Sequence, residues 1–256
     1  MTRTLVDVAL EAATCTRCKL AGMGRTQVVF GAGDPDADLM FIGEAPGLHE
    51  DRQGEPFVGA AGQLLNRMLG EIGLVREDVY IANVIKSRPP GNRDPEPDEI
   101  EACTPWLVEQ ISLVQPRLIV TLGNFATKFV LQTTTGITRT RGQVYAWHGR
   151  SVIPTFHPSA ILRGGGETSR QFQDLREDFA LVQRTLAASA ADTAASASAP
   201  IGDPGPDPPA LPVEPARPVP TAAPSPAPLA TPGLAARAKR PLIVPEPADE
   251  EQLELF

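Results

Sequence analysis

Four short apolar runs, separated by segments with helical spacing, are the feature that most constrains the fold of this 256-residue chain. The runs are rich in β-branched residues and are bounded by turn residues, which is typical of strands buried on both faces of a parallel sheet. They lie at residues 38–44, 78–84, 117–123 and 151–156. The intervening segments with apolar residues at helical spacing are 59–73, 97–114 and 124–132. The pattern predicts a three-layer α/β/α sandwich with a central parallel sheet of about four strands.

The C-terminal part of the chain has a different composition. Of the 27 prolines, 16 lie from Pro200 onward, in a stretch that has no hydrophobic period. We therefore expect a folded domain at residues 1–187 and a disordered Pro/Ala-rich linker at 188–249. The part after residue 187 has 9 acids and 4 bases, against 22 acids and 19 bases before it. The nearly neutral front part neither supports nor excludes nucleic acid as a partner, since local basic patches survive a balanced total.

The sequence contains no signal for membrane insertion or export. No run of about 18 apolar residues occurs, and residues 1–15 read as a short amphipathic helix rather than a signal peptide. We expect a cytoplasmic protein, monomeric and without a membrane partner. In a reducing compartment its three cysteines indicate metal binding or free thiols rather than disulfides.

Glycines and polar residues follow each of the four predicted strands. They are residues 43–59, Asn83, Gly123 with Asn124, and residues 157–166. Taken singly, each has an ordinary explanation, such as a turn or a core position. Because the carboxyl ends of parallel strands meet at one edge of a sheet, their joint placement predicts a ligand site there.

Five motifs in order resemble a known family. They are CTRC at 15–18, GEAPG at 43–47, PFVGAAGQLL at 56–65, NVIKSRPPGNR at 83–93 and HPS at 157–159. The chain resembles the iron-sulfur-containing uracil-DNA glycosylases, known as family 4, from about residue 15 to 162. The resemblance implies a base-excision repair enzyme that flips uracil out of single- or double-stranded DNA and hydrolyses its N-glycosidic bond, leaving an abasic site. The alternative is a catalytically weak DNA- or clamp-binding protein on the same fold.

The resemblance also implies a base pocket. Phe57 is expected to stack on the flipped ring, and the Asn83 amide to accept from the uracil imide N–H while donating to a carbonyl oxygen. Cytosine reverses that donor and acceptor and is rejected. Glu50 is expected near C5 of the ring, where it disfavours the thymine methyl. The turn of Gly43, Ala45 and Gly47 supplies backbone amides to the same pocket.

Two residues are candidates for catalysis. His157 is expected to donate a hydrogen bond to the uracil oxygen on which negative charge develops, which is typically worth roughly 10²- to 10³-fold in rate. Ala45 stands where the best-known uracil-DNA glycosylases have an aspartate, so Glu44 is the nearest carboxylate to orient water. The alternative for Glu44 is a structural role in which it caps the loop.

DNA contacts are expected around the pocket. The segment 157–166 resembles a loop that enters the minor groove, with Ile161 or Leu162 as an apolar wedge in the vacated stack. Arginines are the phosphate candidates. The expected DNA-binding residues are Ser159, Ile161, Leu162, Arg163, Arg88 and Arg93.

The resemblance implies a 4Fe-4S cluster bound by four cysteines, of which this chain has three. Cys15, Cys18 and Cys103 match three positions, and Ser87 occupies the fourth. A serine alkoxide is a poor iron ligand because its high pKa makes deprotonation costly. Serine or water could complete the cluster, a three-iron cluster could form, or the site could be empty, with the cysteines packed as small hydrophobes. Retention of three cysteines favours a bound cluster.

The last residues carry a second motif. Residues 250–256 read EEQLELF, and this segment resembles the short motif by which bacterial replication and repair proteins bind the sliding clamp. The residues expected to contact the clamp are Gln252, Leu253, Leu255 and Phe256.

Overall fold

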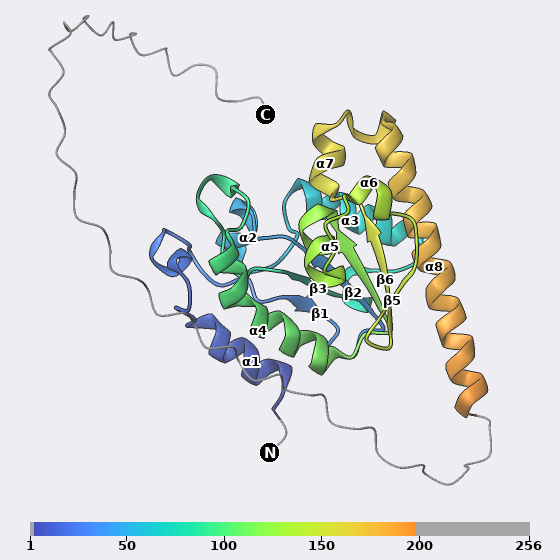
Figure 1. The fold of residues 1–256 in the computed structure, drawn as a ribbon, viewed down its shortest axis with the longest axis horizontal. Helices are drawn as coiled ribbons and strands as arrows, with labels where there is room; N and C mark the ends of the chain where they lie inside the picture. The colour runs from blue at the N-terminus through green and yellow to red at the C-terminus, as the bar shows by residue number, and fades with distance from the viewer. Residues whose placement is uncertain (1–2, 198–256) are drawn as a thin grey trace, which may run out of the picture. The chain divides into compact units, whose positions relative to one another are not determined.

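The computed structural model describes residues 3–197 of the chain and is built on a six-stranded sheet with strand order β1-β3-β2-β4-β6-β5 (Figure 1). The four central strands are parallel and match the four predicted runs. They are β2 (Leu39–Gly43), β3 (Tyr80–Asn83), β4 (Leu118–Leu122) and β6 (Arg150–Thr155). The antiparallel edge strands β1 (Ala32–Gly33) and β5 (Tyr145–Trp147) were not predicted, because two or three residues give no readable alternation.

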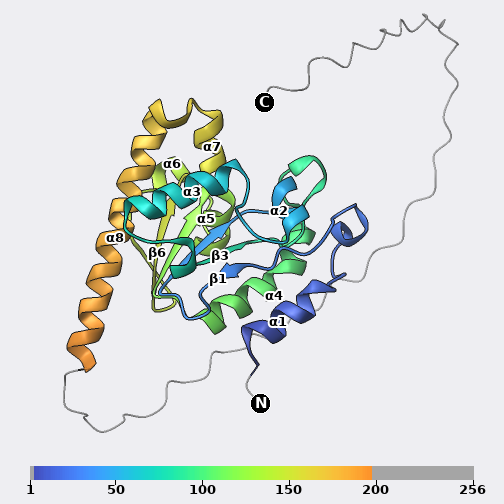
Figure 2. The same cartoon turned by 180° about the vertical axis from the view of Figure 1, so that it is seen from behind.

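Helices cover both faces of the sheet, which confirms the α/β/α sandwich. Alternate residues of β2 point to opposite sides: Met40 and Ile42 join one core cluster, and Leu39 and Phe41 join the other. The first cluster includes buried residues of α1 (Leu5–Ala13), α4 (Pro97–Val114) and α5 (Gly123–Leu131). The second includes α3 (Ala60–Glu71) and α8 (Arg170–Ala197). Figures 1 and 2 show α1 alongside α4, with α8 on the other side of the sheet.

The longer predicted helices begin and end at recognisable signals. In α4, the Glu99 carboxylate accepts a hydrogen bond from the backbone N–H of Glu96. Pro97 occupies the first turn, where a backbone N–H has no carbonyl partner within the helix, so the missing N–H of proline costs nothing. The helix ends at Val114, and the C-cap residue Gln115 adopts a left-handed conformation with φ 52°. Helix α1 begins with a capping box between Thr4 and Asp7. The remaining short elements are α2 (Leu48–Gln53), α6 (Ile137–Thr140), α7 (Pro158–Arg163), and 3₁₀ turns at Lys19–Gly22, Arg76–Asp78, Pro90–Asn92 and Gly166–Thr168.

Helix α8 ends at Ala197, beyond residue 187, and the predicted domain boundary stays a prediction. Residues 198–256, which hold most of the predicted linker and all of the C-terminal motif, lie outside the described residues. Within residues 3–197, none of the helices has the length and apolar character needed to cross a membrane.

Candidate active site

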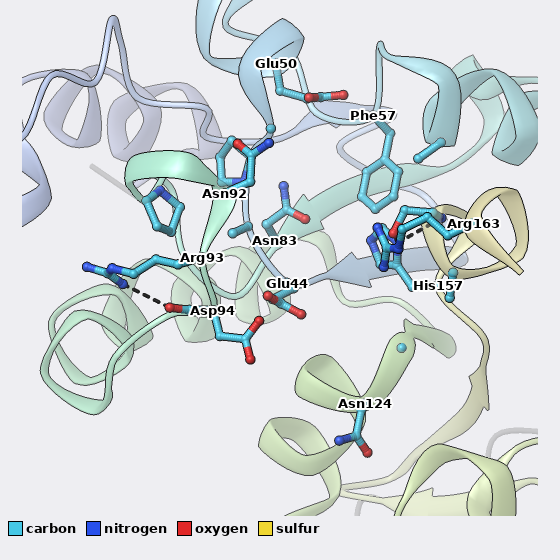
Figure 3. A pocket seen from close by; sticks show the side chains of 18 of the residues that line it. Glu44, Glu50, Phe57, Asn83, Asn92, Arg93, Asp94, Asn124, His157 and Arg163 are labelled. Carbon is cyan, nitrogen blue, oxygen red and sulfur yellow. Dashed lines mark hydrogen bonds between the residues drawn. The ribbon is translucent and has the colours of Figure 1, made fainter. Parts of the chain in front are cut away.

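A pocket of about 440 Å³ lies at the carboxyl ends of the four parallel strands, a volume suited to a small planar ligand. Figure 3 shows the side chains of Phe57, Asn83 and His157 grouped around it, with Glu44 nearby. Ten of the residues given a role from the sequence line the pocket: Glu44, Ala45, Gly47, Glu50, Phe57, Asn83, Arg93, His157, Ser159 and Arg163. The structure therefore brings together the side chains that the motifs had indicated.

Phe57 is held in an unusual backbone conformation. Its φ is 54°, a region that bulky side chains rarely adopt. Gly62 makes this conformation compatible with the start of α3, because a Cβ at Gly62 would lie 1.7 Å from the Phe57 carbonyl oxygen. The Phe57 ring is 5% exposed, and its centroid is 5.5 Å from that of His157. The PFVGAAG motif therefore fixes an aromatic ring in the wall of the pocket.

Asn83 ends β3 and carries an unused acceptor. The side chain is 2% exposed, and its Oδ1 is buried without a hydrogen-bond partner among the described residues. Buried polar atoms are almost always paired, because an unpaired one costs about 1–3 kcal/mol. Gly43 gives this amide room, since a Cβ at that position would lie 2.4 Å from Oδ1 and 2.6 Å from the Phe57 ring. The site thus presents an acceptor beside an aromatic face.

The geometry at His157 determines which ring nitrogen carries the proton. His157 is the N-cap of α7, and the backbone N–H of Ser159 donates to its Nδ1 over 3.1 Å. Because Nδ1 accepts, the neutral ring carries its proton on Nε2. Burial lowers the pKa of His157 to about 4, and the positive charge of Arg163 acts in the same direction. His157 is therefore a neutral donor near pH 7.

Glu44 is half-buried beside a second carboxylate. Burial raises the pKa of Glu44, the negative charge of Asp94 acts in the same direction, and the positive charge of Arg163 opposes both, so that the pKa is about 7. Figure 3 shows the carboxyl groups of Glu44 and Asp94 on the same side of the pocket. At neutral pH, Glu44 therefore exists in both its protonated and ionised forms, as a group that exchanges protons with water requires.

Glu50 is fixed by backbone donors. Its Oε1 accepts from the N–H groups of Val58 and Gly59, at 3.0 and 2.9 Å, where α3 begins. A Cβ at Gly47 would lie 2.7 Å from its Oε2. Glu50 therefore forms a rigid part of the pocket wall.

The segment after β6 resolves one alternative that the sequence left open. Ile161 is fully buried in the core cluster that contains α3 and α8, whereas Leu162 is 39% exposed. Ile161 is therefore part of the hydrophobic core, and Leu162 is the residue of the two that is available to DNA. The Ser159 hydroxyl lies 2.8 Å from His157 Nδ1, so its contact is with the catalytic candidate.

The two predicted arginines of the 83–93 motif differ in their contacts. Arg93 binds the buried Glu99 carboxylate through two hydrogen bonds of 2.9 and 2.6 Å. This bidentate pair uses its donors within the protein. Arg88 is half-buried and donates from Nε to Asn92 over 2.7 Å, with the rest of its guanidinium free of hydrogen bonds to the described residues.

Cys103 lies near Cys15 and Cys18, although it is 85 positions further along the chain than Cys18. Burial raises the pKa of the Cys103 thiol, and Cys15 and Cys18 add to the same effect. Cys103 Sγ accepts the Lys86 backbone N–H over 3.5 Å. Among residues 3–197, no three His, Cys, Asp or Glu side chains converge on one point as the ligands of a single metal ion do. In a cluster, each thiolate binds a different iron, so the ligands need not converge.

Ser87 does not match the three cysteines as a ligand. Its Oγ accepts a hydrogen bond of 2.9 Å from Arg25, whose guanidinium also binds the Cys15 carbonyl. The hydroxyl is thus already engaged by a cation, and it lacks the thiolate character that iron prefers. Ser87 therefore does not fit the fourth ligand position of a cluster held by four side chains.

Three polar or charged side chains at these sites were not predicted from the sequence. Asp94 and Asn92 line the pocket, and Arg25 contacts Ser87. Asn92 lies in the RPPGNR motif and Asp94 directly follows it, so the motif was a signal from which both could have been predicted as pocket residues. Arg25 lies outside every motif, and only the structure places it at the cysteines.

Comparison with known proteins gives consistent matches. The family model described as the uracil DNA glycosylase superfamily matches residues 30–180. A type-4 uracil-DNA glycosylase of Sulfurisphaera tokodaii is 48% identical over 167 residues, covering 62% of this chain and 76% of the relative. The type-4 enzyme of Archaeoglobus fulgidus is also 48% identical, over 62% of this chain and 83% of its own. That of Thermotoga maritima is 48% identical over 61% and 82%.

Proposed function

The chain belongs to the uracil-DNA glycosylase superfamily, and from this premise we propose that it excises uracil from DNA by hydrolysing the N-glycosidic bond, leaving an abasic site for repair. One observation carries the proposal: the buried Oδ1 of Asn83, which has no hydrogen-bond partner within residues 3–197, lies beside the Phe57 ring in the pocket. An acceptor of this kind matches the imide N–H of uracil. The pyrimidine ring would stack on the aromatic face.

Recognition follows from the two ends of the Asn83 amide. Oδ1 accepts from the uracil N3–H, and Nδ2 donates to a carbonyl oxygen of the base. Cytosine presents an unprotonated N3 and an amino group at these positions, so both contacts would fail, and the buried amide would stay unpaired. The rigid Glu50 carboxylate supports exclusion of the thymine methyl, because the pocket wall at that point cannot retreat.

Bond cleavage leaves negative charge on the departing base. His157 donates from Nε2 to the uracil oxygen where this charge develops, and the Ser159 N–H holds the ring in the required tautomer. Because the pKa of His157 is about 4, the donor is neutral imidazole. Ionised Glu44 orients the water that attacks the sugar. The negative charge of Asp94 raises the pKa of Glu44 and so favours its protonated form.

DNA is held around the pocket by the segment after β6. The exposed Leu162 fills the space that the flipped nucleotide leaves, and Arg163 and Arg88 bind phosphates. Ser159 acts mainly through His157, and the Glu99-bound Arg93 orders the loop.

Cys15, Cys18 and Cys103 hold an iron-sulfur cluster through three thiolates. When bound, the cluster ties the segment after α1 to the start of α4. It supplies no step of the excision, which is not a redox reaction. Iron and sulfide analysis of protein purified without oxygen tests this, with Cys18→Ser as the matched control. Iron and sulfide no higher in the wild type than in Cys18→Ser would exclude the cluster.

The C-terminal residues bind the bacterial sliding clamp. Gln252, Leu253, Leu255 and Phe256 supply the motif. Deleting residues 252–256 is expected to abolish binding to a purified clamp and to spare excision from a short oligonucleotide. Clamp binding that survives the deletion contradicts the assignment.

Excision itself is tested with uracil in single-stranded and U:G oligonucleotides, followed by alkaline cleavage of abasic sites. The wild type is expected to cut at uracil, and Asn83→Ala to lose most of the rate. Asn66→Ala, at an exposed position of α3, is the matched control. A wild type that binds these oligonucleotides without releasing uracil would support the catalytically weak alternative.

A further inference from the structure

Lys86 is a fully buried lysine in a network of uncharged groups. It is 1% exposed, and among the described residues it forms no ion pair. Its Nζ donates to the backbone carbonyl of Asn83 over 2.7 Å and to Oε1 of Gln110. A buried lysine is costly, so its retention in a site without a carboxylate points to a specific task for its N–H donors.

Gln110 is oriented so that its oxygen faces Lys86. Its Nε2 donates to the Phe30 carbonyl over 2.9 Å and to the Tyr80 hydroxyl over 3.0 Å. With both amide hydrogens used in this way, Oε1 is the atom left for Lys86. Gly31 leaves room for this arrangement, because a Cβ at that position would lie 2.8 Å from the Tyr80 hydroxyl and 2.9 Å from Gln110 Nε2.

The peptide after Asn83 is held at both ends. Its carbonyl accepts from Lys86 Nζ, and its N–H, which belongs to Val84, donates to the Gly43 carbonyl over 2.9 Å. Fixing this plane fixes the direction in which the Asn83 side chain leaves the backbone. That side chain carries the unpartnered Oδ1 of the pocket.

We propose that Lys86 is a positioning residue for base recognition: by binding the Asn83 carbonyl and Gln110, it sets the orientation in which the Asn83 amide meets uracil. The inference rests on the proposed function. It does not depend on the charge of Lys86, because a neutral amine supplies the same N–H donors to both acceptors. Without Nζ, the carbonyl is a buried acceptor with no partner, and the peptide is free to tilt away from the pocket.

The test is a double-mutant cycle on the single-turnover rate of uracil release. Lys86→Met is expected to slow release by about 10- to 100-fold, the effect of misplacing a recognition group by about 1 Å. In the Asn83→Ala background, the same change is expected to have little further effect, since its target is gone. An equal slowing in both backgrounds would show that Lys86 acts independently of Asn83 and would overturn the proposal.

Inhibition by free uracil gives a second measurement that does not require DNA binding. Lys86→Met is expected to weaken this inhibition along with the rate, while affinity for the same oligonucleotide containing thymine is unchanged. Lys128→Met, the same change at an exposed position of α5, is the matched control and is expected to keep the rate within about twofold. Inhibition as strong in Lys86→Met as in the wild type would contradict the proposal.

Two further outcomes separate this inference from the proposed function. If Lys86→Met does not fold, Gln110→Met removes the other acceptor and is expected to slow release in the same non-additive way. A wild type that releases no uracil refutes the proposed function, whereas an active wild type with an equally active Lys86→Met refutes the positioning role alone.

Discussion

The pH dependence of excision should report the ionisation of Glu44. With a pKa of about 7 in the free protein, Glu44 is ionised in only about one molecule in ten at pH 6. If ionised Glu44 orients the attacking water, kcat/KM falls about tenfold from its plateau at pH 6. The acid limb of the profile has its midpoint near pH 7. We use kcat/KM because it reports the groups of the free enzyme.

Two neighbours should move this midpoint in opposite directions. Asp94→Asn removes a negative charge that raises the pKa of Glu44, so the acid limb moves to lower pH. Arg163→Gln removes a positive charge that lowers this pKa, so the limb moves to higher pH. Only midpoints are compared, because Arg163 also binds DNA and its loss lowers the absolute rate.

The measurement is a series of kcat/KM values between pH 5 and pH 9 at constant ionic strength. Glu44→Gln is expected to lower the plateau and remove the limb. An acid limb that persists in Glu44→Gln with an unchanged midpoint would show that another group titrates, and the role of Glu44 would be refuted. Midpoints that move in the same direction in both neighbour variants would equally contradict the electrostatic argument.

Three further predictions concern stability. Glu44→Gln should stabilise the protein at neutral and alkaline pH, because the raised pKa of Glu44 in the folded state lowers the free energy of unfolding above pH 4.5, and most above pH 7. After discounting for partial exposure, the gain is about 1–2 kcal/mol. Urea unfolding should show this gain at pH 8 and little of it at pH 4. Gly62→Ala should cost at least about 3 kcal/mol because its Cβ meets the Phe57 carbonyl, and a melting temperature near that of the wild type would contradict this. Cys103→Ala should lower the melting temperature more than the excision rate, whereas the reverse would place the cysteine site in the chemistry.

The sheet and its site could be predicted because both depend on local patterns. The four buried strands, such as Leu118–Leu122, have continuous apolar runs, and chain direction alone brings their carboxyl ends together. Phe57, Asn83 and His157 then fall on one edge without any knowledge of distances. The short edge strands could not be predicted, because their two or three residues are held by pairing with β3 and β6.

Contacts between side chains distant in sequence were beyond prediction. Ile161 and Leu162 are neighbours with similar side chains, and only the packing of α7 against the core decides which is exposed. The charge environment of Glu44 likewise depends on Asp94, which is 50 positions away. Arg25 reaches Ser87 across 62 positions, and nothing in its own surroundings in the sequence marks it.

The segment from Asn83 to Cys103 connects the base pocket to the cysteine site through one residue. Lys86 holds the Asn83 carbonyl with its side chain, and its backbone N–H donates to Cys103 Sγ. A disturbance at the cysteines can therefore reach the pocket by moving the Lys86 backbone, even though no cysteine lines the pocket. If so, Cys103→Ala should slow uracil release by more than its smaller folded fraction explains. This additional slowing should vanish in the Asn83→Ala background. A rate loss that is the same in both backgrounds would show that the cysteine site influences excision by another route.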